Sequence, residues 1–248
     1  LSYLTGYKDC SLNQIKAFRQ LGSKTAGHPE FGLLKSIETT TGPLGQGLAN
    51  AVGMAIAEKS LNNRFGNIIN HRTWVIAGDG CLMEGLSQES ISLAGHLQLK
   101  KLIVIFDSNN ISIDGPTSLT CSDNHKKRFE ASNWNTIELN GHDFQSIENG
   151  FNMACKSKKP TLLVCHTTIG YGSPNKSGKE TSHGSPLGED EAKLTKENLN
   201  WKSDKFQVPI SIKKKWLKIG SRGKKKRISW QKKFLKNKNF REIKKQFK

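Results

Sequence analysis

Residues 74–115 read WVIAGDGCLMEGLSQESISLAGHLQLKKLIVIFDSNNISIDG, and this stretch decides the fold of the chain. It contains two short apolar runs, residues 74–77 and 102–106, which have the length and composition of buried strands. Residues 87–97 lie between them and have the spacing of a helix. The pattern therefore predicts a strand, a helix and a second strand parallel to the first, joined by a right-handed crossover.

Polar residues follow both of these predicted strands. The first strand ends at Gly78-Asp79-Gly80, where glycine lets the backbone turn and approach a ligand closely, and the second is followed by Asn109. Because parallel strands end at one edge of a sheet, we expect Asp79 and Asn109 to lie close together. Mg²⁺ or Ca²⁺ would accept the Asp79 carboxylate, the Asn109 amide oxygen and a nearby main-chain carbonyl, with phosphate oxygens completing the shell. A Gly-Asp-Gly tripeptide alone is more often a turn, but this context favours a metal-diphosphate site.

The rest of the body continues this alternation of strands and helices. Residues 116–135 are expected to form an excursion from the sheet. In the helix expected at residues 48–61, Ala49, Gly53 and Ala57 share one line, which predicts close packing against a neighbouring element. The fold class is therefore α/β, an open, doubly wound and mainly parallel sheet with functional loops beyond the strand ends. Besides the elements above, we expect helices at residues 8–21, 48–61 and 143–156 and strands at residues 136–139 and 161–168.

Composition excludes several classes of protein. The chain has 248 residues, 35% of them hydrophobic, which is enough for a core and predicts a soluble, globular protein. It contains no run of about 18 apolar residues and no secretory leader, so we expect a cytoplasmic protein without a membrane partner. The five cysteines are scattered and form no CxxC pair, which argues against a disulfide framework or a zinc site. The chain opens with Leu1 and enters mid-pattern, so one interpretation is that it is a fragment.

Charge is distributed unevenly along the chain. Residues 1–201 carry 20 Lys and Arg against 19 Asp and Glu, whereas residues 202–248 carry 19 against 2, so the net charge of +18 lies almost wholly in the second segment. We therefore divide the chain into a body, residues 1–201, and a basic helical tail, residues 202–248. In the tail, Phe240, Ile243 and Phe247 recur at helical spacing, which predicts an apolar face. A basic segment with aromatics can bind nucleic acid or another polyanion, but a solvated helical linker has the same composition.

Several longer motifs recur in order along the body: LTGY, FRQLGSKTAGHPE, ETTTGPLGQGLANAVGMAIAEK, GDGCLMEG, SNNISIDG, IGYGSPNKSG and HGSPLGEDE. As a set they resemble the thiamine diphosphate-binding domain of the transketolase family. Related thiamine enzymes share the Gly-Asp-Gly and the downstream Asn but not the whole set. The resemblance implies the thiamine diphosphate-binding fold and transfer of a two-carbon ketol unit from a ketose phosphate to an aldose phosphate, in the pentose phosphate pathway.

The resemblance also implies which residues hold the metal and the cofactor. Asp79 and Asn109 would bind Mg²⁺ or Ca²⁺ through their side chains, and Ile111 through its main-chain oxygen. Gly80 would lie beside the cofactor diphosphate, where backbone N–H groups suit an anion. The residues implied to bind thiamine diphosphate are Gly42, Pro43, Leu44, Gly80, Asn109, His28 and His183.

Three side chains are implied to act in catalysis. His28 and His183 would lie near the cofactor and the substrate hydroxyls, where a histidine can move a proton or hydrogen-bond a sugar oxygen. Glu84 would contact the catalytic glutamate of a partner subunit. Without the resemblance each has an ordinary interpretation, the histidines as exposed loop residues and Glu84 as an acid in the first turn of a helix.

Parts of the family pattern have no counterpart in this chain. Two histidine motifs that precede LTGY in the family are absent, and so are the pyrimidine-binding domain and its cofactor-activating glutamate. We therefore expect part of an active site, inactive alone, that works on sugar phosphates as a homodimer or with a complementary pyrimidine-domain chain. Because the tail tryptophans follow the family pattern, we favour a linker role for the tail and do not expect nucleic-acid binding. The alternative is a non-catalytic remnant that binds anions or nucleic acid through the basic tail.

Overall fold

The structure is a computed structural model that describes residues 1–237 and 239–246. The chain forms two compact units. The smaller unit contains most of the predicted tail together with residues 1–42 and 60–70 of the predicted body. The division into body and tail at residue 201 therefore stays a prediction. The larger unit comprises residues 43–59 and 71–202, and the smaller comprises residues 1–42, 60–70 and 203–248.

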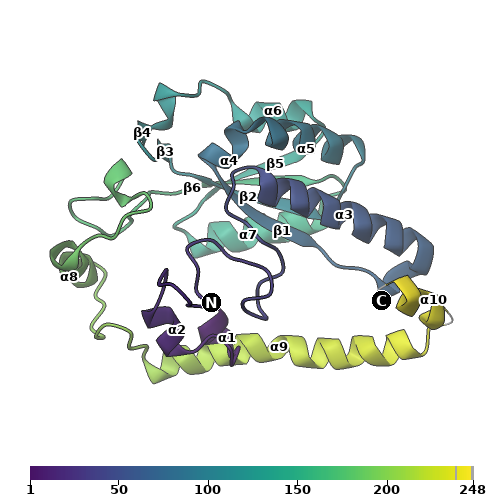
Figure 1. The fold of residues 1–248 in the computed structure, drawn as a ribbon. Helices are drawn as coiled ribbons and strands as arrows, with labels where there is room; N and C mark the ends of the chain where they lie inside the picture. Colours follow the sequence, from purple (N-terminus) through teal and green to yellow (C-terminus); the bar gives the residue numbers. More distant parts are fainter. Residues whose placement is uncertain (238, 247–248) are drawn as a thin grey trace. The chain divides into compact units, whose positions relative to one another are not determined.

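The larger unit is built on a four-stranded parallel sheet with the order β1, β2, β6, β5 (Figure 1). The register pairs Gly78 of β1 with Asp107 of β2, and Asp107 with Cys165 of β6. The carboxyl ends of three strands therefore meet at one edge, and the predicted parallel α/β fold is confirmed. The strands are β1 (Thr73–Gly78), β2 (Leu102–Ser108), β5 (Asn135–Asn140) and β6 (Thr161–His166).

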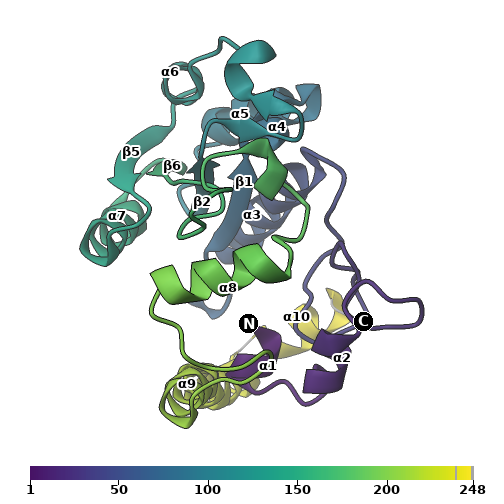
Figure 2. The same cartoon turned by 90° about the vertical axis from the view of Figure 1, so that its left-hand side faces the viewer.

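Helices cover both faces of this sheet, because alternate residues of its central strands point to opposite sides. On one face, Leu102, Val104 and Phe106 pack with residues of α3, α5 and α6. On the other face, Ile103 belongs to a cluster with Ala154 of α7, and Figure 2 shows α7 on the opposite side of the strands from α5 and α6. The sheet is thus doubly wound, as predicted. The covering helices are α3 (Gln46–Phe65), α5 (Gly85–His96), α6 (His125–Ala131) and α7 (Phe144–Lys156).

The helix expected at residues 8–21 is much shorter in the structure. Only α2 (Leu12–Lys16) is α-helical there, and the Ser11 side chain caps it by accepting a hydrogen bond from the Gln14 N–H. The chain then turns, and Arg19 takes a left-handed φ of 62°. The spacing of apolar residues predicted a helix but not the turn that ends it.

Helix α3 buries a different face from the one that we expected. Gly53 is exposed, and no neighbouring element of the described chain lies within 4 Å of the position that its Cβ would take. The buried face instead carries Leu48, Val52 and Ala55. The predicted close packing of the small-residue line is therefore wrong within this chain, because small residues permit close packing without requiring it.

The smaller unit is organised around the long basic helix α9 (Ile210–Leu235). Gly220 lies so near α1 that an added Cβ would be 2.0 Å from the carbonyl oxygen of Thr5. Trp230 Nε1 donates a hydrogen bond of 2.7 Å to the carbonyl oxygen of Ile68. The tail is helical, as predicted, and Trp230, although 40% exposed, makes this contact within the smaller unit.

The remaining helices and strands are short. The predicted excursion at residues 116–135 contains α6, and Phe247, expected on the apolar face of the tail, lies outside the described residues. All five cysteines are free thiols. Among the described residues, no helix has both the length and the apolar character that a bilayer crossing requires. The other elements are α1 (Ser2–Thr5), η1 (Gly66–Ile68), α4 (Asp79–Met83), β3 (Ile111–Ser112), β4 (Gly115–Pro116), η2 (Thr117–Leu119), η3 (Glu180–Ser182), α8 (Glu189–Asn198) and α10 (Phe240–Gln246).

Candidate functional site

A cavity of about 790 Å³ lies in the larger unit, where β1, β2 and β6 end. Loops from three parts of the sequence meet there, because the chain leaves all three strands at the same edge. The predicted site residues that line it are Leu44, Asp79, Gly80, Glu84, Asn109, Ile111 and His183. Lining residues that we did not predict include Asp107, Ser112, Thr167, Thr168, Ile169 and Gly170.

Asp79 lies at the junction of β1 and α4 (Asp79–Met83). Gly78 has a φ of −93° and Gly80 is helical, so the sharp turn expected at Gly-Asp-Gly is instead a direct transition from strand to helix. Glycine at position 80 still permits a close approach, because an added Cβ would be 3.3 Å from Cδ1 of Leu44. The junction therefore brings backbone N–H groups and the Asp79 side chain to the same wall of the cavity.

The Asp79 carboxylate is buried, with 7% of the residue exposed. Among the described residues, its Oδ2 atom has no hydrogen-bond partner. Burial, helped by the nearby Asp107 carboxylate, raises the pKa of Asp79 to about 6, although the backbone N–H groups of Asp79 and Asn109 act in the opposite direction. A buried carboxylate oxygen without a donor is costly, and a bound cation would satisfy it.

The orientation of the Asn109 amide is set by two hydrogen bonds. Its Oδ1 accepts from the Ile111 N–H at 3.0 Å, and its Nδ2 donates to Oδ2 of Asp107 at 3.3 Å. An amide oxygen has two lone pairs, so Oδ1 can bind a metal ion while keeping the Ile111 contact. Asp79 and Asn109, the two side chains predicted to hold the metal, therefore line one cavity. Each has an oxygen atom that can bind a divalent cation.

Asp107 connects this wall to the loop that follows β6. The Thr167 hydroxyl donates to Oδ1 of Asp107, and the Thr167 N–H donates to the carbonyl oxygen of Ser108 at 3.2 Å. Neither residue was among the predicted site residues. Their position could have identified them, because Asp107 is the last but one residue of β2 and Thr167 directly follows β6, at the edge that carries the site.

The charge of the cavity limits what it can bind unaided. Asp79, Glu84 and Asp107 contribute carboxylates, and none of the described lining residues is Lys or Arg. These carboxylates would repel a diphosphate unless a divalent cation lay between them. No group of three or more His, Cys, Asp or Glu in the described chain could hold a metal, so amide, main-chain and diphosphate oxygens would have to complete the shell around Asp79.

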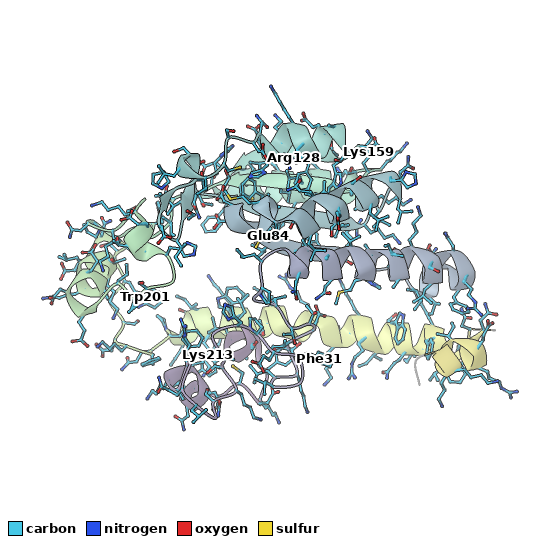
Figure 3. The ribbon with its side chains drawn as sticks, turned by 45° about the horizontal axis from the view of Figure 1, so that its top comes forward. Phe31, Glu84, Arg128, Lys159, Trp201 and Lys213 are labelled. Atoms are coloured by element: carbon cyan, nitrogen blue, oxygen red, sulfur yellow. The ribbon has the colours of Figure 1, made fainter. Side chains whose placement is uncertain are left out.

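The segment before α3 packs against the start of α5. Gly45 has a φ of +80°, and an added Cβ would be 3.0 Å from Cβ of Glu84. Glu84, labelled in Figure 3, lies between α4 and α5 at the N-cap position of α5, and it lines the cavity. Leu44 lines the cavity as predicted, whereas Pro43 belongs to the same unit but is not part of the lining.

The two predicted catalytic histidines are found in different units. His183 follows η3 in the larger unit, is exposed and lines the cavity, with its N–H donating to the Glu180 carbonyl oxygen at 2.7 Å. His28 belongs to the smaller unit, where it packs on Gly42. An added Cβ at Gly42, whose φ is +153°, would be 2.9 Å from Cγ of His28. This contact explains the need for glycine at position 42, and it brings two predicted site residues together.

The fold and the cavity define a class of protein. The sheet is doubly wound and parallel, and its strand ends carry a buried aspartate oxygen with no partner among the described residues, an oriented asparagine and closely approaching backbone. This is the arrangement of an α/β domain that binds a cofactor at its strand ends. Comparison with known proteins agrees with this class. The family model for transketolase, thiamine diphosphate binding domain, matches residues 1–248, so the chain belongs to the transketolase family through that domain.

Individual relatives lead to the same family. The chain is 50% identical over 232 residues to a transketolase of Rhodobacter capsulatus, which covers 93% of this chain and 34% of that protein. It is 53% identical over 242 residues to a transketolase of Buchnera aphidicola subsp. Acyrthosiphon pisum, covering 94% and 36%. The crystal structure of transketolase from Campylobacter jejuni matches with a TM-score of 0.94 and 42% identity, covering 97% of this chain and 38% of that one. The chain therefore spans about a third of the length of the relatives that it matches.

Proposed function

We propose that the chain provides the thiamine diphosphate and divalent-metal site of a transketolase, which transfers a two-carbon ketol unit from a ketose phosphate to an aldose phosphate. The observation that carries the proposal is the buried, unpartnered Oδ2 of Asp79 in the cavity that Asn109 also lines. The family match supports the thiamine diphosphate part. The metal, the pentose phosphate pathway and a cytoplasmic location belong to the proposal itself.

In this proposal the side chains of Asp79 and Asn109 and the main-chain oxygen of Ile111 hold Mg²⁺ or Ca²⁺. When bound, thiamine diphosphate supplies the reactive carbon that carries the two-carbon unit between sugars. Gly80 lies against the diphosphate, and Leu44, together with Gly42 and Pro43 from the preceding segment, lies against the rest of the cofactor. The protein contributes position, charge balance and exclusion of water, all of which depend on the strand-end cavity.

The histidines have a separate role in the proposal. His183 is exposed on the cavity lining, where its ring can donate to a sugar hydroxyl oxygen or accept the proton of that hydroxyl. His28 is proposed to act in the same way, on the strength of its family motif. Glu84, on the lining, is proposed to face the catalytic glutamate of a partner subunit, so the working enzyme is a homodimer or a complex with a pyrimidine-domain chain.

Sugar phosphates are the proposed substrates. A transketolase from Pichia stipitis, 38% identical to this chain with a TM-score of 0.89, has been solved in complex with sedoheptulose 7-phosphate. A ketose phosphate bound there supports the same substrate class here. Because the chain covers 36% of that structure, the residues that complete the substrate site are proposed to come from outside this chain.

The basic tail supports a second hypothesis less well. The Lys and Arg side chains along α9 are largely exposed, as anion binding by a non-catalytic remnant would need. However, Trp230 donates to the carbonyl oxygen of Ile68 and stacks on Phe234 with the ring centroids 4.9 Å apart, so these two aromatic side chains serve packing rather than base stacking. This use of the aromatics favours a helical linker, and nucleic acid is not part of the proposed function.

Calorimetry of the whole chain tests the proposal. Thiamine diphosphate should bind in the presence of Mg²⁺ and far more weakly after chelation of the metal. Asp79→Ala should weaken metal-dependent binding by more than about 100-fold, because it removes a ligand rather than a supporting group. Asp190→Ala changes an exposed aspartate on α8 and serves as the matched control. Equal affinity of the Asp79 variant and the parent would refute the site.

A further inference from the structure

His142 lies in the turn between β5 and α7, directly before the Asp143 side chain that caps α7. No predicted role involved this histidine. Its Nε2 accepts a hydrogen bond of 2.9 Å from the backbone N–H of Thr168, which is 26 positions later in the chain. Its ring also stacks on Tyr171, with the ring centroids 4.1 Å apart and the planes inclined by 20°. One side chain therefore contacts the loop after β6 at two points.

The hydrogen bond defines the role of His142 Nε2. A backbone N–H can only donate, so Nε2 is the acceptor in this contact. The backbone of the turn is held as well, because the His142 N–H donates to Oδ1 of Asn140 at 2.9 Å. The ring is thus presented to Thr168 in a fixed orientation.

Glycine at position 141 provides independent support for a built contact. Its N–H donates to the carbonyl oxygen of His166 at 2.8 Å. An added Cβ at Gly141 would be 2.4 Å from Cγ2 of Thr167 and 3.0 Å from the His166 oxygen. A larger residue at this position would force the Thr167 side chain or the turn to shift, so glycine permits the close contact between the turn and the end of β6.

The loop that His142 contacts is a wall of the cavity. Residues 167–170 line it, and the Thr167 hydroxyl bonds Asp107, which in turn accepts from Asn109. His142, which is not part of the cavity lining, bonds Thr168 from the β5–α7 turn. The segment is therefore held at two points, by Asp107 at Thr167 and by the β5–α7 turn at Thr168.

We propose that His142 is a positioning residue which, together with Tyr171, holds residues 167–170 in place as the wall of the cofactor cavity. The effect on cofactor affinity rests on the proposed function, whereas the clamp itself does not. His142 touches neither the metal ligands nor the cavity, so its influence passes through the backbone of Thr168.

Amide hydrogen exchange of the whole chain tests the clamp without any ligand. His142→Leu should speed exchange of the Thr168 amide by about 2- to 10-fold, the loss expected for one hydrogen bond. His142→Gln can place an amide oxygen near the former Nε2 position, so it should restore most of the protection. His96→Leu makes the same change at an exposed histidine at the end of α5 and should leave Thr168 unaffected. Unchanged exchange in His142→Leu would overturn the clamp, and a Gln variant that behaves like Leu would overturn the acceptor role.

Cofactor titration then tests what the clamp does. With Mg²⁺ present, His142→Leu should raise the dissociation constant for thiamine diphosphate by about 2- to 10-fold, with recovery in His142→Gln. Tyr171→Phe, which keeps the stack, should match the parent, and Tyr171→Leu should follow His142→Leu. Faster exchange without weaker binding would overturn the positioning role. A parent chain that binds no thiamine diphosphate would refute the proposed function instead, and the exchange result alone would decide the clamp.

Discussion

The side-chain amide of Asn109 donates a hydrogen bond to Oδ2 of Asp107 at 3.3 Å, while the other carboxylate oxygen of Asp107 accepts from the hydroxyl of Thr167. Asp107 thus orients a proposed metal ligand and anchors a wall of the cavity with one side chain. Removing a group that orients a metal ligand in this way commonly weakens metal binding.

Asp107→Ala should weaken Mg²⁺-dependent cofactor binding by about 10- to 100-fold, because the Asn109 amide loses the partner that fixes its orientation. Calorimetry measures the loss. Asp107→Asn keeps an oxygen that can accept from Asn109 and should retain more affinity than the Ala variant. An Asp107→Ala chain that binds as tightly as the parent would show that Asn109 needs no support.

Gly95→Ala should lower the free energy of unfolding of the larger unit by about 1–3 kcal/mol, the usual cost of overpacking. Its Cβ would be 1.7 Å from the carbonyl oxygen of Ser132, and backbone cannot move aside cheaply. Gly53→Ala, in an exposed part of α3, is the control and should stabilise by about 0.5–1 kcal/mol. Urea unfolding midpoints compare the two variants. The packing assignment is wrong if Gly95→Ala unfolds at the same denaturant concentration as the parent.

Glu191 should make stability depend on pH in acid. Hydrogen bonds from the Ser173 hydroxyl and from the side chain and N–H of Asn175 lower the pKa of Glu191 to about 2. A depressed folded-state pKa contributes stability that is fully present above the ordinary value of 4.5 and is lost as pH falls toward 2. The melting temperature of the parent should therefore fall more steeply between these pH values than that of Glu191→Gln.

Glu197→Gln, at an exposed position on the same helix, controls for the change of charge. Its pH profile should follow that of the parent. Profiles that are parallel for the parent and for Glu191→Gln would show that the loop does not stabilise the ionised carboxylate.

The chain alone should show no turnover of xylulose 5-phosphate and ribose 5-phosphate, even with saturating thiamine diphosphate and Mg²⁺. It covers 34% of the Rhodobacter transketolase, and general acid–base assistance from groups outside it would be worth about 100- to 10,000-fold. Co-expression with the remaining parts of a transketolase should restore activity in a coupled assay. Robust activity of the chain alone would contradict the partial-site proposal, and failed complementation would favour the non-catalytic alternative.

Local patterns predicted much of the fold. The apolar runs that became β2 and β6 were recognisable because a buried parallel strand is continuously apolar. The run that became β1 is also apolar, but Trp74 and Ile76 of this edge strand are exposed in the structure, so its burial was predicted wrongly. The spacing of α7 was recognisable because one of its faces packs on the sheet. The same patterns failed where a local property permits a structure without requiring it. The line of small residues through Gly53 packs against no described neighbour, and the helix expected around α2 ends early at a turn.

The sequence by itself placed Asp79 and Asn109 at strand ends, because strand ends and glycines are local features. Only the tertiary structure decided that Asp107 holds Thr167, 60 positions away, and that His142 holds Thr168. These contacts depend on the strand order β1, β2, β6, β5, which sets β6 between two strands that precede it in the chain. Strand order follows from how all the elements bury their apolar faces together, so no single stretch of sequence carries it.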